Sequence, residues 1–430
     1  MATKAPPPPN YAAATVQAQA FAAGHAALSG QARRDNTDAI ERLLAQLDNA
    51  TLAHDAAKLP SGDPLYNFAG RALLRRGLTL PRPFDRGDAH FGATNRPAAD
   101  NDGYRPPLKV GVLLPLTGAQ AVAAEAVRNG FLAGYYAETR RRPTLRFYDS
   151  SAGVKAAYAR LVADGNDFAV GPLGREETDA LFGNDTLDVP LLALNRGNRT
   201  PALGSAAFSL SPEDEGISLA QALIERGSKR VLLIAGNEDA QRRTAQAAKA
   251  QLERRGLQVL DGLGYSGQMT EALAQLAQTN APDTVLLILK GPQARTVVPQ
   301  LALANLAGLP RYSSSMITSG IGKPLEDMAL DGTIFPTEPW LIKPIAGLPT
   351  QSAAAARTDT ARGPAARLFA FGLDAWLLTG HLEQLALSPN TRISGSTGLL
   401  SLDGFGNILR RPAWSRFVAG VPQPLGDGAR

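Results

Sequence analysis

The chain of 430 residues contains no cysteine. That absence excludes disulfide bonds, thiol catalysis and cysteine-ligated metal sites from this sequence. The chain also has no run of about 20 apolar residues, so we predict no membrane-spanning helix. It has only four histidines, none of them spaced like metal ligands, and the patterns His-Glu-x-x-His and Gly-x-Ser-x-Gly are both missing. The usual signatures of metalloproteases and serine hydrolases are therefore absent.

The charge of the chain does not indicate a nucleic-acid partner. The formal net charge is +5, with 44 basic and 39 acidic residues. The basic residues form no stripe with interleaved aromatic residues. Arg140–Arg142 and Arg254–Arg255 instead stand where helices are expected to end, and cations there complement the helix dipole. We interpret the positive charge as helix-end stabilisation.

The stretch Lys109–Gly118, with the helix that follows it, sets the pattern of the chain. Val110 to Leu114 has no polar residue, which is typical of a strand covered on both faces. Pro115 cannot donate to a sheet, so the strand is expected to end there. In the helix to about Glu138, Gly130 and Gly134 lie on the narrow buried face, and we expect them to let the helix lie close on the sheet.

Further strand–helix units follow this one and predict an α/β fold with two similar lobes. Strands are expected at 145–148, 168–170 and 189–194, and again at 229–235, 257–260 and 284–289 after the helix-capping residues Ser211–Glu213. The predicted domain is 108–425, with one lobe at about 108–209 and 312–398 and the other at about 210–311 and 399–425. Residues 341–364 read as a mobile loop, 367–386 as a long helix, and 395–403 with 408–417 as a terminal hairpin that completes the second sheet.

The first 107 residues read differently. Residues 1–10 are a proline-rich tether, and 1–79 as a whole is a short α-helical segment. Its helices are expected at 11–29, from the capping residues Asp35–Thr37, and from Leu65 to Arg76 before Gly77. Small residues at the crossings resemble helical-hairpin repeats, without a measurable period. Residues 80–107 are rich in proline, glycine, asparagine and aspartate and read as a linker.

Several stretches together resemble one known family. Leu113–Gly118 ends the first strand and Val127–Tyr136 follows in its helix; Leu210–Glu215, Gly372–Ala375 and Gly395–Asp403 come later. In combination they resemble the LpoA family of penicillin-binding-protein activators, over about Leu108 to Leu425. The opening strand, Thr-Gly turn and helix are shared by many type I periplasmic-binding folds, and the C-terminal motif narrows the resemblance.

The resemblance implies both a fold and a role. The fold is the two-lobe type I periplasmic-binding-protein fold, with Rossmann-like parallel sheets, three crossovers and a cleft, here preceded by a short α-helical segment. The role is that of an outer-membrane lipoprotein on the periplasmic face, which contacts a class A penicillin-binding protein and stimulates peptidoglycan synthesis. Lipoproteins need an anchor cysteine, so we expect Met1–Thr3 to begin a mature chain from which that cysteine has been removed. The helical segment is also short beside the helical-repeat domain typical of the family.

The cleft is the predicted site, because ligands of open α/β sheets lie beyond the carboxyl ends of the strands. That rule selects Thr117, Gly118, Ser150, Ser151, Pro172, Leu173 and Asn195 on the first lobe, and Asn237, Glu238, Lys290 and Gly291 on the second. Asn195–Arg199 is basic and bulky where amino-acid receptors of this fold usually place small hydroxyl residues. Gly262–Gly267 matches the dinucleotide fingerprint by letter, but Asp283 precedes its strand instead of ending it, so we interpret a glycine-rich turn.

Three functions stay open at this point. A non-catalytic protein-interaction module that regulates cell-wall synthesis is the leading hypothesis, with no cofactor and no metal. The alternative is a solute-binding receptor for an amino-acid-type transporter, which uses the same fold with a ligand-specific cleft. The helical segment and the linker favour the first hypothesis, because solute receptors normally start at the first strand. An enzyme is the third possibility.

Overall fold

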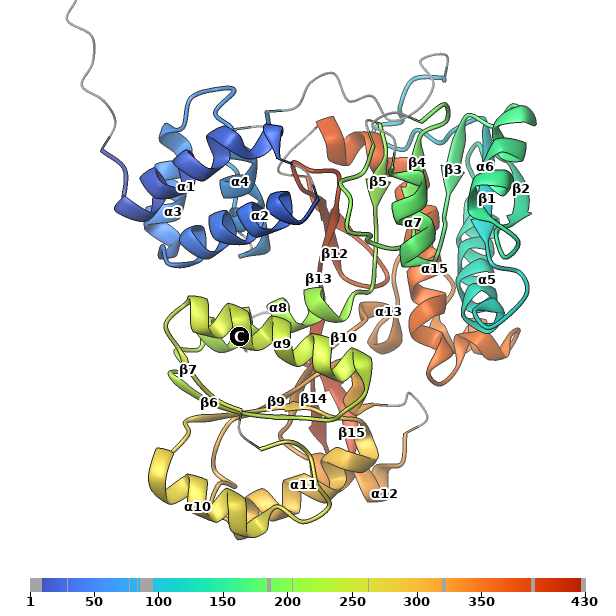
Figure 1. The fold of residues 1–430 in the computed structure, drawn as a ribbon. Helices are drawn as coiled ribbons and strands as arrows, with labels where there is room; N and C mark the ends of the chain where they lie inside the picture. The colour runs from blue at the N-terminus through green and yellow to red at the C-terminus, as the bar shows by residue number, and fades with distance from the viewer. Residues whose placement is uncertain are drawn as a thin grey trace, which may run out of the picture.

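The computed structural model describes residues 10–28, 30–76, 78–82, 84–85, 96–183, 187–202, 204–261, 263–318, 322–387 and 391–426. Almost all of the expected proline-rich tether, the helix stop at Gly77 and Gly262 of the glycine-rich turn lie outside these residues. Figure 1 shows a helical segment and a first lobe side by side, with a second lobe below them. Over the described residues, no helix combines the length and apolarity needed to cross a membrane.

The first lobe is built on a five-stranded parallel sheet. Its strands are β1 (Lys109–Leu114), β2 (Thr144–Asp149), β3 (Phe168–Val170), β4 (Leu191–Ala193) and β5 (Ala206–Ala207), in the order β2-β1-β3-β4-β5. The helices are α5 (Ala121–Ala137), α6 (Val154–Ala163), α7 (Arg175–Leu181) and α15 (Ala365–Leu387). Val112 packs with Phe131 of α5 and Trp376 of α15, whereas Leu113 packs with Leu161 of α6 on the opposite face. The apolar strand is thus covered on both faces, as predicted.

The second lobe is built on a seven-stranded mixed sheet. Its strands are β6 (Arg230–Ala235), β7 (Gln258–Leu260), β8 (Thr284–Ile288), β9 (Arg311–Ser313), β10 (Ile334–Thr337), β14 (Ala413–Val418) and β15 (Val421–Pro424). The order is β15-β14-β10-β9-β8-β6-β7, with β14 antiparallel to its neighbours and the five strands from β10 to β7 parallel. The longer helices are α8 (Pro212–Glu225), α9 (Asp239–Arg254), α10 (Thr270–Asn280) and α11 (Gly291–Leu303); η2 (Ser315–Ile317), α12 (Pro324–Asp327) and η3 (Met328–Leu330) are short. Residues of α8 and α9 pack in one core cluster, and residues of α10 and α11 in another.

The two-lobe fold is confirmed, but two crossover positions predicted from the sequence are wrong. β9 and β10 extend the second sheet, so the chain returns to the first lobe after Thr337 and not at 312. β11 (Ile393–Ser394), β12 (Leu399–Leu402) and β13 (Ile408–Arg411) form a separate sheet whose Leu400 belongs to the first-lobe core. The expected strand 408–417 is two strands, because Pro412 has no N–H with which to continue the ladder. β14 therefore enters the second lobe at Ala413 and not at 399.

The predicted mobile loop at 341–364 is also wrong. This stretch contains the second half of α13 (Pro339–Ile342), together with α14 (Gln351–Ala355) and η4 (Asp359–Ala361). Ala354 and Ala361 are buried, and Trp340 stacks on Phe369 of α15 with ring centroids 5.2 Å apart. Two of the alanines that resembled loop composition, Ala354 and Ala361, are therefore small core residues that pack in one cluster with Phe369 of α15.

The glycines of α5 serve a helix–helix contact and not the predicted helix–sheet contact. A Cβ on Gly130 would lie 1.9 Å from the carbonyl oxygen of Phe369, and one on Gly134 would lie 2.6 Å from the Trp376 ring. Both of these neighbours belong to α15. The absence of side chains at these two positions therefore sets the close packing of α5 on α15.

The described residues of the helical segment form four α-helices, one more than predicted. They are α1 (Ala13–Gly24), α2 (Gly30–Ala45), α3 (Asn49–Lys58) and α4 (Tyr66–Arg75), with η1 (His25–Ala27) after α1. The missed helix α3 is capped by Asp48, whose carboxylate accepts a 2.8 Å bond from Thr51 N. Asp35–Thr37 lies inside α2 and does not cap it. Leu409 of β13 joins the apolar core of the segment, which ties it to the third sheet.

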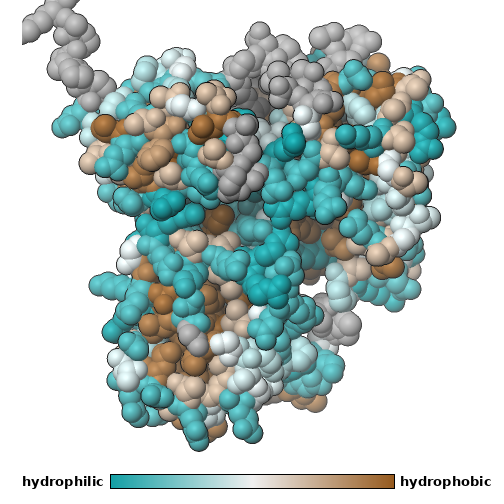
Figure 2. Space-filling view, viewed as in Figure 1, coloured by the Kyte–Doolittle hydropathy of each residue, from teal (hydrophilic) through white to brown (hydrophobic). Residues whose placement is uncertain are grey.

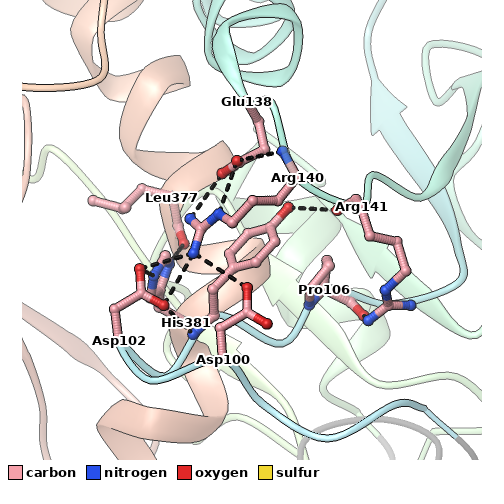
Figure 3. Close-up of polar contacts among 9 residues, drawn as sticks. Asp100, Asp102, Pro106, Glu138, Arg140, Arg141, Leu377 and His381 are labelled. Atoms are coloured by element: carbon pink, nitrogen blue, oxygen red, sulfur yellow. Dashed lines mark hydrogen bonds and ion pairs between the residues drawn. The ribbon is translucent and has the colours of Figure 1, made fainter.

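Residues 96–107, the second half of the expected linker, are fixed on the first lobe. Arg105 forms a 2.8 Å ion pair with Glu383 of α15. Figure 3 shows the guanidinium of Arg140 among three carboxylates, with distances of 2.9 Å to Asp102, 3.4 Å to Asp100 and 2.9 Å to Glu138. Arg140 thus secures the linker, a role that differs from the predicted compensation of a helix dipole.

Candidate functional site: the cleft between the lobes

On the first lobe, the loop after β1 is held by Asp149 at the end of β2. The Asp149 carboxylate accepts bonds from Leu116 N (3.0 Å), Ser151 N (2.9 Å) and Ser151 Oγ (2.5 Å), and Thr117 Oγ1 lies 3.4 Å away. The Ser151 bonds, followed by that from Leu116 N, lower the pKa of Asp149 to about 2. Thr117 and Ser151 were predicted to face a ligand, but their hydroxyls bond within this loop. Gly118 adopts a positive φ of 78° in the same turn.

The remaining first-lobe residues divide between the interior and the cleft. Ser150 is only 1% exposed, and its hydroxyl lies 3.5 Å from Glu177 Oε2, away from the cleft. Pro172 accepts a bond from Leu194 N through its carbonyl oxygen. Asn195 Nδ2 donates to the carbonyl oxygen of Leu173 at 2.7 Å. This bond fixes the loop after β4 against the loop after β3.

On the second lobe, the four predicted residues form a local polar group. Lys290 Nζ lies 2.6 Å from Glu238 Oε1. Asn237 precedes Glu238 in the loop after β6, and its carbonyl oxygen accepts from Arg242. Gly291 begins α11, and a Cβ there would lie 2.7 Å from the carbonyl oxygen of Ile317. Opposite charges in this group are therefore neutralised within the second lobe.

A cavity of about 440 Å³ lies between the lobes, but most of the predicted residues do not line it. Of the eleven, Leu173 and Asn195 are part of its wall; the other nine are not among the lining residues in the described part of the chain. The remaining wall is formed by Gln120, Ala123, Arg175, Leu194, Arg196, Gly197, Leu210, Ser211, Pro212, Glu213, Arg243, Leu368 and Phe371. The second lobe contributes the start of α8 and a residue of α9, not its strand ends, so the strand-end rule chose the wrong edge there.

One ion pair joins the two lobes beside the cleft, and a second joins two residues of its wall within the second lobe. Arg196, in the loop after β4, forms a 2.7 Å ion pair with Asp214 of α8. Arg243 of α9 pairs with Glu213 at 2.8 Å. Burial acts to raise the pKa of Asp214, but Arg196 and Arg75, together with hydrogen bonds from Arg196 and Ser211, outweigh it, so the pKa lies below its usual value. The bulky Asn195–Arg199 stretch was the sequence signal for this bridge.

A second polar network fixes the lobes at their junction. We call Glu215, Ser315, Glu338 and Arg367 the interlobe clamp. Arg367 of α15 contacts Glu215 of α8 at 2.9 Å, Glu338 at 2.7 Å and Ser315 Oγ at 2.7 Å. Ser315 in turn donates to Glu215 through its N–H (2.6 Å) and its hydroxyl (2.8 Å). The sequence analysis predicted none of these residues as a site, and Glu215 entered it only within the family-like stretch Leu210–Glu215.

The C-terminal motif also serves the junction. Its Ser396 and Thr397 donate their N–H groups to the carboxylate of Asp374, and the Thr397 hydroxyl donates at 2.6 Å. A Cβ on Gly395 would lie 2.7 Å from the same carboxylate oxygens. Asp374 is fully buried, and burial raises its pKa to about 6 despite these bonds. The two motifs Gly372–Ala375 and Gly395–Asp403 are therefore one structural unit that turns the chain at the lobe junction.

Of the charged residues that line the cleft, Arg196, Glu213 and Arg243 are in ion pairs, whereas Arg175 is exposed and donates to Asn198 at 3.1 Å. In the described ranges there is no cluster of three potential metal ligands. Seen from the side drawn in Figure 2, hydrophilic residues predominate where the second lobe meets the rest of the molecule. The geometry is that of a polar junction in which ion pairs join the two lobes.

Comparison with known families identifies the chain. A family model described as "LppC putative lipoprotein" matches residues 103–420. The chain belongs to the LppC family. The match covers both lobes, the third sheet and the junction, and it begins within the docked part of the linker.

Curated relatives of this LppC-family chain are named penicillin-binding protein activator LpoA. One from Photobacterium profundum is 26% identical over 351 residues, which cover 74% of this chain and 57% of the relative. One from Vibrio antiquarius is 27% identical, covering 72% of this chain and 57% of the relative. The LppC-family chain thus spans little more than half the length of these relatives.

Solved structures support the fold over almost the whole LppC-family chain. Full-length LpoA from Haemophilus influenzae matches with a TM-score of 0.65 and 20% identity, covering 95% of this chain and 78% of that one. The LpoA C-domain from the same organism, described as a regulator of PBP1A, matches with a TM-score of 0.64 and 22% identity, covering 74% and 100%. A "putative branched-chain amino acid ABC transporter" from Chromobacterium violaceum is 26% identical with a TM-score of 0.58, covering 72% and 100%.

Proposed function

We propose that the chain is a non-catalytic activator of a class A penicillin-binding protein, which stimulates peptidoglycan synthesis by direct contact in the periplasm. Membership of the LppC family and the names of the LpoA relatives support this proposal. The match to a regulator of PBP1A agrees with it at the level of the fold. Because the chain spans only part of the length of its curated relatives, the activity needs a direct test.

The interlobe clamp is the observation that carries the proposal. Arg367 joins α15 of the first lobe to α8 of the second through buried carboxylates, and Arg196–Asp214 adds a second bridge. A solute receptor works by opening and closing around its ligand. An activator instead needs a defined surface that favours the competent conformation of its partner. Lobes joined by these buried ion pairs suit the second role.

The proposed location follows from the lipoprotein description of the family. A lipid anchor would hold the protein at the periplasmic face of the outer membrane, and the helical segment would stand between the anchor and the lobes. The segment is fixed to the third sheet, since Leu409 of β13 is part of its core. We therefore propose that the segment and the lobes reach the partner as one body.

The decisive experiment measures peptide crosslinking by a purified cognate class A penicillin-binding protein on lipid-linked precursor, with and without the chain. We expect the crosslinked fraction to rise with chain concentration, and association in the micromolar range, about −8 kcal/mol, is sufficient. The loss-of-function variant is Arg367→Glu, which places a third carboxylate in the interlobe clamp. This variant should no longer stimulate crosslinking. Unchanged crosslinking without association at tens of micromolar would refute the proposal.

A solute receptor is the second candidate, favoured by the cleft of about 440 Å³ and by the match to the Chromobacterium violaceum protein. Thermal-shift screening with amino acids and nucleotides separates the two. A ligand at 100 times its dissociation constant stabilises a protein by about 2.7 kcal/mol, which a melting curve detects. We expect no saturable shift. A reproducible one that Arg243→Ala abolishes would favour the receptor.

A further inference from the structure

A second cavity of about 440 Å³ lies outside the interlobe cleft, where three parts of the chain meet. Leu74 and Arg75 of α4 belong to the helical segment, α8 and β14 to the second lobe, and β12 and β13 to the third sheet. Figure 1 shows α4 in the helical segment above, α8 in the second lobe below and the β12–β13 pair beside them. We call this space the three-way pocket. Its size is within the range of small-molecule sites.

The three-way pocket has an excess of positive charge. Five arginines and two carboxylates line it: Arg75, Arg226, Arg392, Arg410, Arg411, Asp214 and Glu225. Some of these charges are already matched, since Arg75 pairs with Glu41, Arg410 lies 3.8 Å from Glu338, and Asp214 pairs with Arg196. Arg411 is exposed, and its side chain makes no hydrogen bond or ion pair within the described residues. Its charge also acts, after burial, to lower the pKa of Arg392.

Tyr312 of β9 also lines the pocket and is 1% exposed. Its buried hydroxyl has no hydrogen-bond partner among the described residues. A buried polar group in that state costs free energy, so its presence calls for an explanation such as a ligand acceptor. The guanidinium of Arg226 lies 5.5 Å from the centre of the Tyr312 ring, and the Trp414 ring lies at 6.4 Å. An oxygen anion entering here would meet a hydroxyl donor and a cation together.

The rest of the wall is largely apolar. Leu74, Ile334, Leu399, Leu409 and Trp414 contribute to it. Leu399 is an exposed hydrophobic residue, and in the β12–β13 register it lies opposite Arg411. The pocket thus places an apolar side chain directly beside an unmatched cation. That combination suits a molecule with an anionic head and an apolar body.

We propose that the three-way pocket binds a small amphipathic organic anion, a carboxylate or phosphate ester with an apolar body. Tyr312, Arg226 and Arg411 recognise the anionic group, while Leu399 and Trp414 contact the body. Because the walls come from the helical segment, the third sheet and the second lobe, the bound molecule stabilises their arrangement. This site does not rest on the proposed function, since it is separate from the interlobe cleft and needs no partner protein.

The test uses three probes with the same body and different heads: 4-phenylbutyrate, 4-phenylbutan-1-ol and 4-phenylbutylamine. Isothermal titration of the full chain measures the binding of each. We expect the carboxylate to bind at least tenfold more tightly than the alcohol and the amine not to bind, because the excess charge of the pocket is positive. Equal binding of carboxylate and amine, or no binding of the carboxylate at millimolar concentration, would overturn the proposal.

Variants locate the site. Arg411→Ala should weaken carboxylate binding at least tenfold, while Arg357→Ala, at an exposed arginine outside the pocket, should leave it unchanged. Tyr312→Phe should weaken binding several-fold and yet raise the melting temperature of the free chain, because it removes a buried hydroxyl that has no partner. A merely structural tyrosine would not combine these two effects. If the carboxylate still binds Arg411→Ala and Tyr312→Phe but no longer binds Arg243→Ala, then it occupies the interlobe cleft. That result would refute the assignment of the site to the three-way pocket.

Discussion

Replacement of Arg367 by methionine is the sharpest test of the interlobe clamp. Methionine keeps an unbranched side chain of similar reach but removes the charge and every donor. The variant loses contacts of 2.9 Å to Glu215, 2.7 Å to Glu338 and 2.7 Å to Ser315. The carboxylates of Glu215 and Glu338 then remain, and the side chain of each is 5% exposed. Arg410, which lies 3.8 Å from Glu338, is only a distant partner.

The expected loss of stability follows from this burial. Removing one partner of a buried ion pair costs about 3–5 kcal/mol, mostly because the other charge is left without compensation. Because the side chain of Arg367 is 28% exposed, water can partly replace it. We therefore expect the lower end, about 3 kcal/mol in the free energy of unfolding.

The pH dependence of that loss has a definite sign. Burial acts to raise the pKa of Glu215, but Arg367 and the Ser315 bonds hold it below the ordinary value of 4.5. In the native protein, the contribution of Glu215 to the free energy of unfolding is fully present above pH 4.5. It is lost as the pH falls through the lowered pKa of Glu215. In the variant, burial dominates and the pKa rises above 4.5, so stability falls as the pH rises. The difference in unfolding free energy between the native protein and the Arg367→Met variant should be large at about pH 7.5 and small at about pH 4.

Urea unfolding of both proteins at the two pH values measures this difference. Arg128→Met is the matched control, because the Arg128–Glu125 pair is exposed at 37% and 53% and its loss should change stability by less than about 0.5 kcal/mol. A double variant with Glu215→Gln should recover part of the loss, since it removes one of the uncompensated charges. A cost below about 1 kcal/mol at neutral pH would show that Arg367 does not hold the lobes together.

Three other substitutions test the helical segment, the helix contact and the motif unit. Glu41→Gln should destabilise the chain by about 2–3 kcal/mol at neutral pH, because the arginine partners of Glu41 outweigh burial and lower its pKa to about 2. In acid unfolding curves, this loss of stability should shrink as the pH falls from 4.5 towards 2. Gly130→Ala should cost more than about 2 kcal/mol in urea unfolding, since its Cβ would lie 1.9 Å from a carbonyl oxygen, whereas Gly308→Ala, with nothing within 4 Å, should be near neutral. Burial raises the Asp374 pKa from 3.8 to about 6, so its contribution to stability should fall as the pH rises through that window, and Asp374→Asn should flatten the curve there; an unchanged slope would contradict it.

The site shows where prediction from sequence stops. Leu173 and Asn195 were found because they follow apolar strands directly, and strand ends in one sheet meet at one edge. Arg243 and Phe371 were missed because they lie on helices far from the strand ends in sequence. Tyr312 carries no sequence signal at all, since a tyrosine in a short strand is ordinary until its hydroxyl proves to have no partner.

The sequence by itself determined the local elements and their class. Apolar runs such as Val110–Leu114 form strands because they can be covered on both faces, and Ser211 begins α8 because its side chain accepts from Asp214 N. Only the tertiary structure decided which sheet β9, β10 and β14 join, because strands of similar composition can pair in either lobe. It alone decided that Gly130 faces α15 and that Arg367 meets Glu215, 152 positions away. Such contacts depend on how the lobes cross over, and no local pattern of residues records that path.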